Sequence, residues 1–138
     1  MTPEEINNDV EEFVDYSKRF AEQCLMEYGE FFPFSSQIDS NGKFSGVGFE
    51  GDDDRPSSQL IIDTMTEHFE NELTKKNIRA HCITFDARVK NKSYPDGIDA
   101  IIISIKHREK SNVIKYYYTY SLSKARKISY HNEWIEGN

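Results

Sequence analysis

Two of the four histidines, His81 and His107, occupy positions from which they could do chemistry. Each stands in a run of alternating apolar residues, and antiparallel pairing of the runs about a loop near residue 94 would set His81 opposite His107. Two facing imidazoles with Asp86 or Glu109 could bind a metal ion, or one imidazole could act as a general base. This pattern predicts a metal-dependent or histidine-using hydrolase. The competing interpretation, which we favour, is that both rings only cover the edge of the core.

The remaining chemical motifs do not indicate a cofactor site. Residues 46–51 match the G-x-G-x-x-G string of dinucleotide-binding loops, but they fall in an expected antiparallel hairpin, and Asp52 to Asp54 would repel a phosphate. Consecutive acids also lack the alternate ligand spacing of a calcium loop. Cys24 and Cys82 are too few for a disulfide framework, and neither has the setting of a reactive thiol. We therefore predict no cofactor and no bound metal.

A second set of residues indicates binding rather than catalysis. In the expected sheet Ile102, Lys106, Lys115 and Tyr117 share one face, which is therefore partly apolar and bordered by cations. Sheets that bind nucleic acid have a similar composition, but the net charge of −7 and the missing RNP strings argue against that partner. The face predicts a surface for another protein.

Charge is divided unevenly along the chain. Residues 1–76 carry 18 acidic and 6 basic side chains, a net charge of −12, whereas residues 77–138 carry 6 and 11, a net charge of +5. On the first expected helix Glu11, Glu12 and Asp15 face outward, where they could steer a basic partner. The alternative is a solvated helix face that contacts nothing. Because no convergent catalytic set accompanies the two surfaces, we predict a non-enzymatic protein-binding module.

Local signals predict a long first helix over residues 3–28. Thr2-Pro3-Glu4-Glu5 has the form of a capping box with proline at the first helical position. Apolar residues then recur every three or four positions up to Tyr28, and Gly29 suits a left-handed C-cap. This helix would carry the acidic surface on the side away from its apolar stripe.

A hairpin and a second helix are expected next. Extended runs over residues 30–38 and 43–49 flank the turn Asp39-Ser40-Asn41-Gly42, and Pro33 should delay the start of the first strand. Ser57 or Ser58 can cap a helix that ends near Lys75-Lys76-Asn77. The apolar period then changes to two, which predicts strands over 78–89 and 98–106 and a third strand that ends at Leu122. The expected register sets Ile83 opposite Ile105. A tight turn at Lys110-Ser111 would then set Ile105 opposite Tyr116 and Ile103 opposite Tyr118, which extends the same apolar face to the third strand.

The predicted fold class is α+β, with a single antiparallel sheet of about five strands, two main helices and the order α-β-β-α-β-β-β. The segment from Ile128 to Ile135 stays open between a strand, a helix and a docked coil. The 138 residues, 37% of them hydrophobic, suit one globular domain over 1–138. No apolar run approaches the ~18 residues of a membrane span, and the acidic N-terminus is unlike a signal peptide. We expect a cytoplasmic protein without a membrane partner.

The segment Gly29-Glu30-Phe31-Phe32-Pro33-Phe34 follows a long acidic helix and precedes the turn at residues 39–42. In this respect the chain resembles small bacterial α+β proteins of uncharacterised function over about residues 25–110. The resemblance implies a stand-alone bacterial domain and transfers no catalytic residue. The general build also resembles that of toxin-neutralising immunity proteins, which implies a protein partner.

Overall fold

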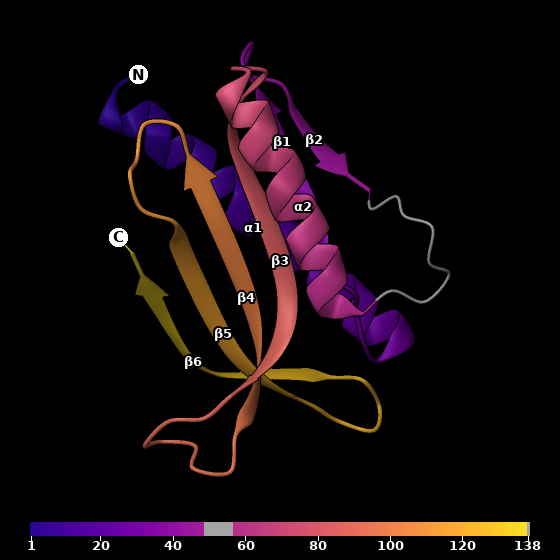
Figure 1. Ribbon diagram of the computed structural model, residues 1–138. Helices are drawn as coiled ribbons and strands as arrows, with labels where there is room; N and C mark the ends of the chain where they lie inside the picture. Colours follow the sequence, from indigo (N-terminus) through magenta and orange to yellow (C-terminus); the bar gives the residue numbers. More distant parts are fainter. Residues whose placement is uncertain (49–56, 138) are drawn as a thin grey trace.

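The computed structural model describes residues 1–48 and 57–137, which form two helices and one six-stranded antiparallel sheet. The sheet order is β2-β1-β3-β4-β5-β6, and the helices lie on opposite faces of it (Figure 1). The predicted α+β class with one antiparallel sheet is confirmed, with one strand more than expected. In chain order the elements are α1 (Pro3–Tyr28), β1 (Phe34–Asp39), β2 (Phe44–Val47), α2 (Ser58–Thr74), β3 (Ile78–Val89), β4 (Ile98–His107), β5 (Ile114–Leu122) and β6 (Ile128–Glu136).

Both helices begin at predicted caps. In α1 the Thr2 hydroxyl accepts a hydrogen bond from the Glu5 amide at 3.1 Å, and the Glu5 carboxylate accepts one from the Thr2 amide at 3.0 Å. Gly29 ends α1 in the left-handed conformation, with φ of 77°. In α2 the Ser57 hydroxyl accepts a hydrogen bond from the Leu60 amide at 3.1 Å. Short-range side-chain contacts therefore set where each helix starts.

The sheet begins and ends with hairpins. β1 starts at Phe34, directly after Pro33, and Asp39 Oδ1 accepts hydrogen bonds from the Asn41 and Lys43 amides at 2.8 and 2.9 Å in the turn to β2. At the other edge, the C-terminal segment that the sequence left open forms β6, which pairs antiparallel with β5. β6 therefore adds a sixth strand at the edge of the sheet, next to β5.

The register of β3 against β4 differs by one residue from our expectation. Ile83 pairs with Ser104 and Cys82 pairs with Ile105. A shift of one residue moves all the side chains of β3 to the opposite face relative to β4. The prediction was wrong because β3 is buried on both faces from Ala80 to Thr84, so alternation of apolar residues does not distinguish its two sides.

The register of β4 against β5 differs by two residues from our expectation. Ile105 pairs with Ile114, where Tyr116 was expected. The connection from Arg108 to Val113 is longer than the tight turn that we placed at Lys110-Ser111. Because strand side chains alternate with a period of two, this shift leaves each residue of β5 on the expected face.

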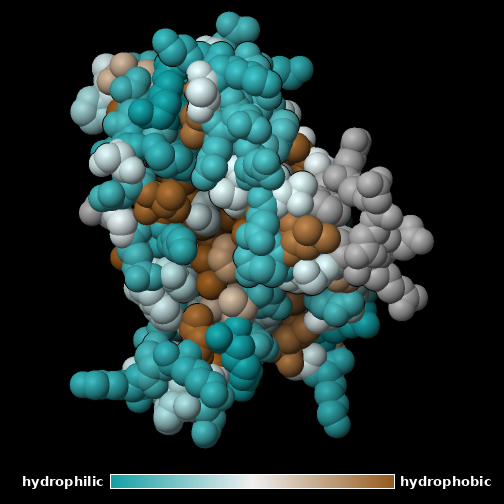
Figure 2. Space-filling model, viewed as in Figure 1, coloured by the Kyte–Doolittle hydropathy of each residue, from teal (hydrophilic) through white to brown (hydrophobic). Residues whose placement is uncertain are grey.

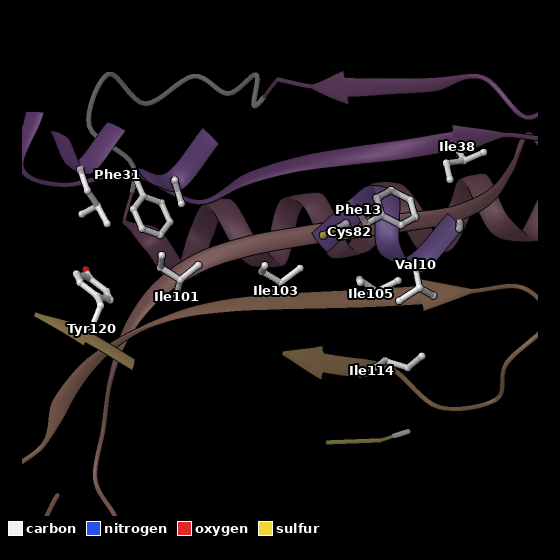
Figure 3. Packing of buried hydrophobic residues seen from close by; sticks show 13 residues of the cluster. Val10, Phe13, Phe31, Ile38, Cys82, Ile101, Ile103, Ile105, Ile114 and Tyr120 are labelled. Carbon is white, nitrogen blue, oxygen red and sulfur yellow. The ribbon is translucent and has the colours of Figure 1, made fainter. Parts of the chain in front are cut away.

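The sheet separates two apolar cores. α1 packs on one face, over β3 and β4, with a core that includes Val10, Phe13, Ala21, Leu25, Cys82, Ile101, Ile103 and Ile105 (Figure 3). α2 packs on the other face, with a smaller core of Ile61, Met65, Phe69, Ile78 and Ile83. On this second face, no helix of the described residues covers β4, β5 and β6 (Figure 1).

A buried polar network joins α1 to β3 and β4. Arg79 donates two hydrogen bonds to the Asp9 carboxylate, from Nε at 3.0 Å and from Nη2 at 2.8 Å. His107 Nδ1 accepts a hydrogen bond from the Glu109 amide at 3.1 Å, so the neutral ring carries its proton on Nε2 and donates it to Asp9 Oδ2 at 2.8 Å. Asp9 is 5% exposed and His107 is fully buried. The network therefore supplies hydrogen bonds to the buried Asp9 carboxylate, whose burial without partners would destabilise the fold.

Candidate interaction surfaces

A groove runs between α1 and the strands β5 and β6, on the face of the sheet that α1 covers. It consists of three adjoining pockets: the first shares Tyr116 with the second, and the second shares Tyr118 and Glu133 with the third. We call it the tyrosine groove. Its lining includes Glu11, Glu12, Asp15, Lys18, Tyr116, Tyr118, Tyr130 and Glu133.

One wall of the tyrosine groove is acidic. Glu11, Glu12 and Asp15, which the sequence singled out as a binding face, line the same pocket beside Tyr116. α1 brings them together because its buried stripe, which includes Phe13 and Ser17, faces the sheet and leaves these three carboxylates on the exposed side. The opposite wall contributes a further carboxylate, that of Glu133 on β6.

The carboxylates impose a negative potential on the tyrosine rings. Burial, together with the charge of Glu11, raises the pKa of Tyr116, and burial with the charge of Glu133 raises the pKa of Tyr118. Burial and the Glu22 carboxylate raise the pKa of Tyr130 in the same way. All three phenols are therefore neutral at physiological pH and act as hydrogen-bonding, aromatic surfaces rather than as charges.

Sequence reasoning found the acids of this groove but not its tyrosines. We expected Tyr116 and Tyr118 to extend the apolar face of the sheet to its third strand, whereas Tyr130 and Glu133 lie on β6, for which the sequence predicted no single structure. The alternation of aromatic and polar residues from Ile128 to Ile135 could have indicated an exposed edge strand. Their position beside α1 depends on the path of β6, which no local signal gives.

The predicted binding face on the other side of the sheet is also assembled. Ile102 pairs with Phe85 and with Tyr117, and Tyr117 stacks on Trp134 with ring centroids 4.8 Å apart and an interplanar angle of 9°. We call Phe85, Ile102, Tyr117 and Trp134 the open face. Ile102 itself is only 5% exposed, so the three half-buried aromatic rings, and not Ile102, form the surface of this face. Figure 2, which views the molecule from the α2 side, shows its apolar patches over β4 and β5 among polar residues.

No described helix lies beside the open face, and one of its cations is held by a backbone carbonyl. Lys106 Nζ donates a hydrogen bond to the His107 carbonyl at 2.8 Å, so its ammonium is turned to the end of β4. Lys115 pairs in register with Glu136 across β5 and β6. Burial and the neighbouring Glu136 raise the pKa of Tyr117 to about 12. The face therefore carries charges of both signs side by side, whereas one whole wall of the tyrosine groove is acidic.

The two histidines do not face one another. His81 pairs with Lys106, and His107 pairs with Ala80, so the two rings project from opposite faces of the sheet. Our expectation that they lie opposite each other was wrong, because it depended on the register that is shifted by one residue. His81 instead stacks on Phe69, with centroids 4.5 Å apart, and burial lowers its pKa to about 4.

The acids proposed to accompany the histidines are also apart. Asp86 lies six residues along β3 from the partner of His107, or roughly 20 Å away. It accepts hydrogen bonds of 2.9 Å from the Tyr120 hydroxyl, and burial raises its pKa to about 6. The Glu109 carboxylate lies 3.7 Å from Arg108 and 3.9 Å from the N-terminal amine. Among residues 1–48 and 57–137, no three metal-ligating side chains gather closely enough to hold an ion.

The remaining motifs have structural explanations where the structure describes them. A Cβ at Gly46 would lie 2.7 Å from the Tyr16 hydroxyl, so this glycine permits close packing of β2 on α1. Residues 49–51 of the glycine string and Asp52 to Asp54 lie outside the described residues. Cys82 is fully buried beside the Ser17 hydroxyl, and burial raises its pKa to about 11, which makes it a poor nucleophile.

Comparisons with known proteins give no assignment: no protein-family model matches the chain, and no similar curated protein or solved structure was found. The resemblance drawn from residues 29–34 therefore stays a prediction. In the part of the chain that the structure describes, no helix has the length and hydrophobicity needed to cross a membrane.

Proposed function

We propose that this protein is a non-enzymatic protein-binding module whose tyrosine groove receives a basic segment of a partner protein. The observation that carries the proposal is the occurrence of carboxylates and half-buried tyrosines in one recess. Acids alone are common on solvated helices, and tyrosines alone are common at sheet surfaces. Together they combine long-range attraction with large, rigid contact areas, which is the combination that protein interfaces use.

The two kinds of residue have different roles in the proposed complex. Glu11, Glu12 and Asp15 are exposed, so they act mainly by accelerating the approach of a positively charged partner. Tyr116 and Tyr118 are partly buried and already ordered by the sheet, so they supply contact area with little further loss of conformational entropy. Lysine and arginine side chains suit such a groove because they attract carboxylates and also stack on aromatic rings.

The acidic lining favours a protein partner over a nucleic acid, because a phosphate backbone would meet carboxylates on both walls of the groove. The immunity-type role that the resemblance implied would make the basic partner a toxin. It is one form of the proposed function and stays a prediction, since no residue of the groove specifies that partner.

The proposal is tested with a defined ligand, a capped and fluorescein-labelled peptide of four Arg-Gly repeats. Fluorescence anisotropy at about 0.1 M salt, where the screening length is ~10 Å, measures its affinity for the wild-type protein and for the variant Glu11→Lys, Glu12→Lys, Asp15→Lys. We expect the groove variant to bind at least about tenfold more weakly, because three attractions become repulsions at the binding site.

A matched variant separates groove binding from general charge attraction. Asp63→Lys, Glu67→Lys, Glu70→Lys changes the net charge by the same amount on exposed residues of α2. It should reduce affinity by less than about threefold, since distant surface charges are screened over ~10 Å. Equal losses in the two variants, or no binding by the wild-type protein, would contradict the proposal.

A further inference from the structure

Lys18, on α1, lies in an unusual place at the end of the tyrosine groove. Its ammonium nitrogen is 4.6 Å from the centroid of the Tyr118 ring and 4.5 Å from that of the Tyr130 ring. The two rings are 6.3 Å apart at an interplanar angle of 70°, so they form an open corner around the ammonium. Both faces of the corner present the negative side of an aromatic quadrupole to the cation.

This arrangement is not the ordinary one for a helical lysine. Glu22 stands four residues later on α1, at the spacing of a helical ion pair, yet no carboxylate of the described residues lies within 4.0 Å of the Lys18 ammonium. Lys18 is instead held by the two rings at the wall of a pocket of about 240 Å³, which Glu133 also lines. The pocket therefore already recognises an organic cation.

We infer that the pocket formed by Tyr118, Tyr130 and Glu133 is a subsite for a lysine or arginine side chain of the partner, and that Lys18 occupies it in the free protein as an internal competitor. This inference rests on the proposed function and names the regulation of that same groove. Lys18 is partly exposed, and a cation that remains in contact with water is held only weakly by aromatic rings. An arginine of the partner can replace it, since guanidinium stacks well on aromatic planes.

Departure of Lys18 would also change the charge that the partner meets. In the free protein its ammonium partly neutralises the end of the groove, between Glu22 on α1 and Glu133 on β6. When a partner's cation takes the corner, Lys18 moves toward solvent and one positive charge is exchanged for another. The subsite thus discriminates against uncharged segments of a partner, because such a segment would displace Lys18 without supplying another positive charge to the two rings.

The test uses choline as the probe, with 3,3-dimethyl-1-butanol as its uncharged isostere, and follows the backbone amide signals of β5 and β6 by NMR. Lys18→Ala removes the internal competitor. Arg19→Ala is the matched control, because it removes the same charge from the next residue, whose side chain is 76% exposed and pairs with Asp15 instead of the tyrosines. We expect Lys18→Ala to bind choline at least about tenfold more tightly than Arg19→Ala or the wild type does.

Three outcomes would overturn the inference. Equal choline affinities of Lys18→Ala and Arg19→Ala would show a general charge effect, and equal binding of the butanol would show an apolar cavity without cation recognition. Retained choline binding after Tyr130→Leu is added to Lys18→Ala would place the ligand elsewhere. Should Lys18→Ala lose its folded spectrum, Lys18→Gln serves as the second variant, with the same outcome required.

The choline result and the peptide result are independent. If Lys18→Ala gains no choline binding while the Arg-Gly peptide still depends on Glu11, Glu12 and Asp15, the inference fails and the proposed function stands. If choline binds as expected but the affinity for the peptide does not change when those acids are replaced, the subsite exists and the proposed function fails. When both hold, Lys18→Ala should also bind the peptide about threefold or more tighter than Arg19→Ala does.

Discussion

β5 presents tyrosines to both faces of the sheet, but their surroundings differ. On the α1 face, Tyr116 and Tyr118 lie beside a helix that stands above the sheet and so creates a recess with acidic walls. On the α2 face, Tyr117 stacks flat on Trp134, and no described helix rises next to it. One strand thus lines a groove on one side and a face without a neighbouring described helix on the other. Aromatic content alone therefore does not make a binding site, because the neighbouring helix α1 provides the recess and the charge.

The largest expected difference between the faces concerns stability. Ile103 pairs with Thr84 and Tyr116 beneath α1 and is fully buried, so Ile103→Ala should lower the free energy of unfolding by about 2–5 kcal/mol. Ile102→Ala removes the same atoms on the open face, where Phe85 and Tyr117 can move into the space, and should cost at least about 1 kcal/mol less. Chemical denaturation measures both. Equal losses would show that the open face is packed as tightly as the α1 face.

A pH-dependent effect separates the two buried histidines. His107 has both ring nitrogens hydrogen-bonded on the α1 face, whereas His81 on the α2 face has no partner for Nδ1 among the described residues. Burial first, then the charges of Lys106 and His68, lower the pKa of His81 to about 4, below its ordinary value near 6.5. Between pH 6.5 and pH 4, His81 is therefore protonated in the unfolded chain but neutral in the folded protein.

The stability that follows from this pKa difference is fully present above pH 6.5 and is lost as the pH falls toward 4. Between pH 7 and pH 5 the loss attributable to His81 should be about 2 kcal/mol. His81→Phe, which can still stack on Phe69, should flatten this part of the stability profile, whereas His131→Gln at an exposed position should not. An unchanged slope in His81→Phe would mean that the histidine is solvated.

The association kinetics of the groove should be sensitive to salt. Reversing Glu11, Glu12 and Asp15 to lysine should slow association with the Arg-Gly peptide by at least about tenfold at low salt. The difference should shrink above roughly 0.5 M salt, where the screening length falls to a few ångströms. Stopped-flow measurement over a salt series checks this. A slowing that persists at high salt would indicate damage to the groove's shape rather than loss of steering.

The smallest expected effect belongs to the open face. Tyr117→Ala removes half of the Tyr117–Trp134 stack, yet binding of the Arg-Gly peptide should change by less than about twofold, because Tyr117 faces the α2 side and lines none of the three pockets of the groove. The anisotropy assay of the groove variants measures it directly. A loss as large as that of the groove variant would move the binding site to the α2 face.

The helices, their caps and the first hairpin could be predicted because neighbouring residues decide them. Thr2 and Glu5 form the capping box within one turn, and Asp39 closes its own turn. The β3–β4 register could not be predicted in this way, since Cys82 and Ile83 are both buried, each under a different helix. The one-residue shift in this register places His81 and His107 on opposite faces of the sheet.

The candidate site was predictable only in part, for a related reason. Glu11, Glu12 and Asp15 share one face of a helix, and helical spacing reveals such a set without any tertiary information. Tyr118 and Tyr130 come together only because β6 pairs with β5 and bends past a bulge between Tyr118 and Tyr120. Strand pairing across a bulge depends on long-range packing, which sequence periodicity does not contain.

The network of Asp9, Arg79 and His107 has a consequence for the order in which the chain folds. Its hydrogen bonds join residues 70 and 98 positions apart, so α1 cannot reach its final place until β3 and β4 have been synthesised and paired. Until then α1 has only local stabilisation such as its capping box, which leaves an isolated helix marginal, and its apolar stripe is exposed to water. A chain in which α1 has not yet docked therefore exposes apolar surface to aggregation and to chaperones, and the buried network closes only when that exposure ends.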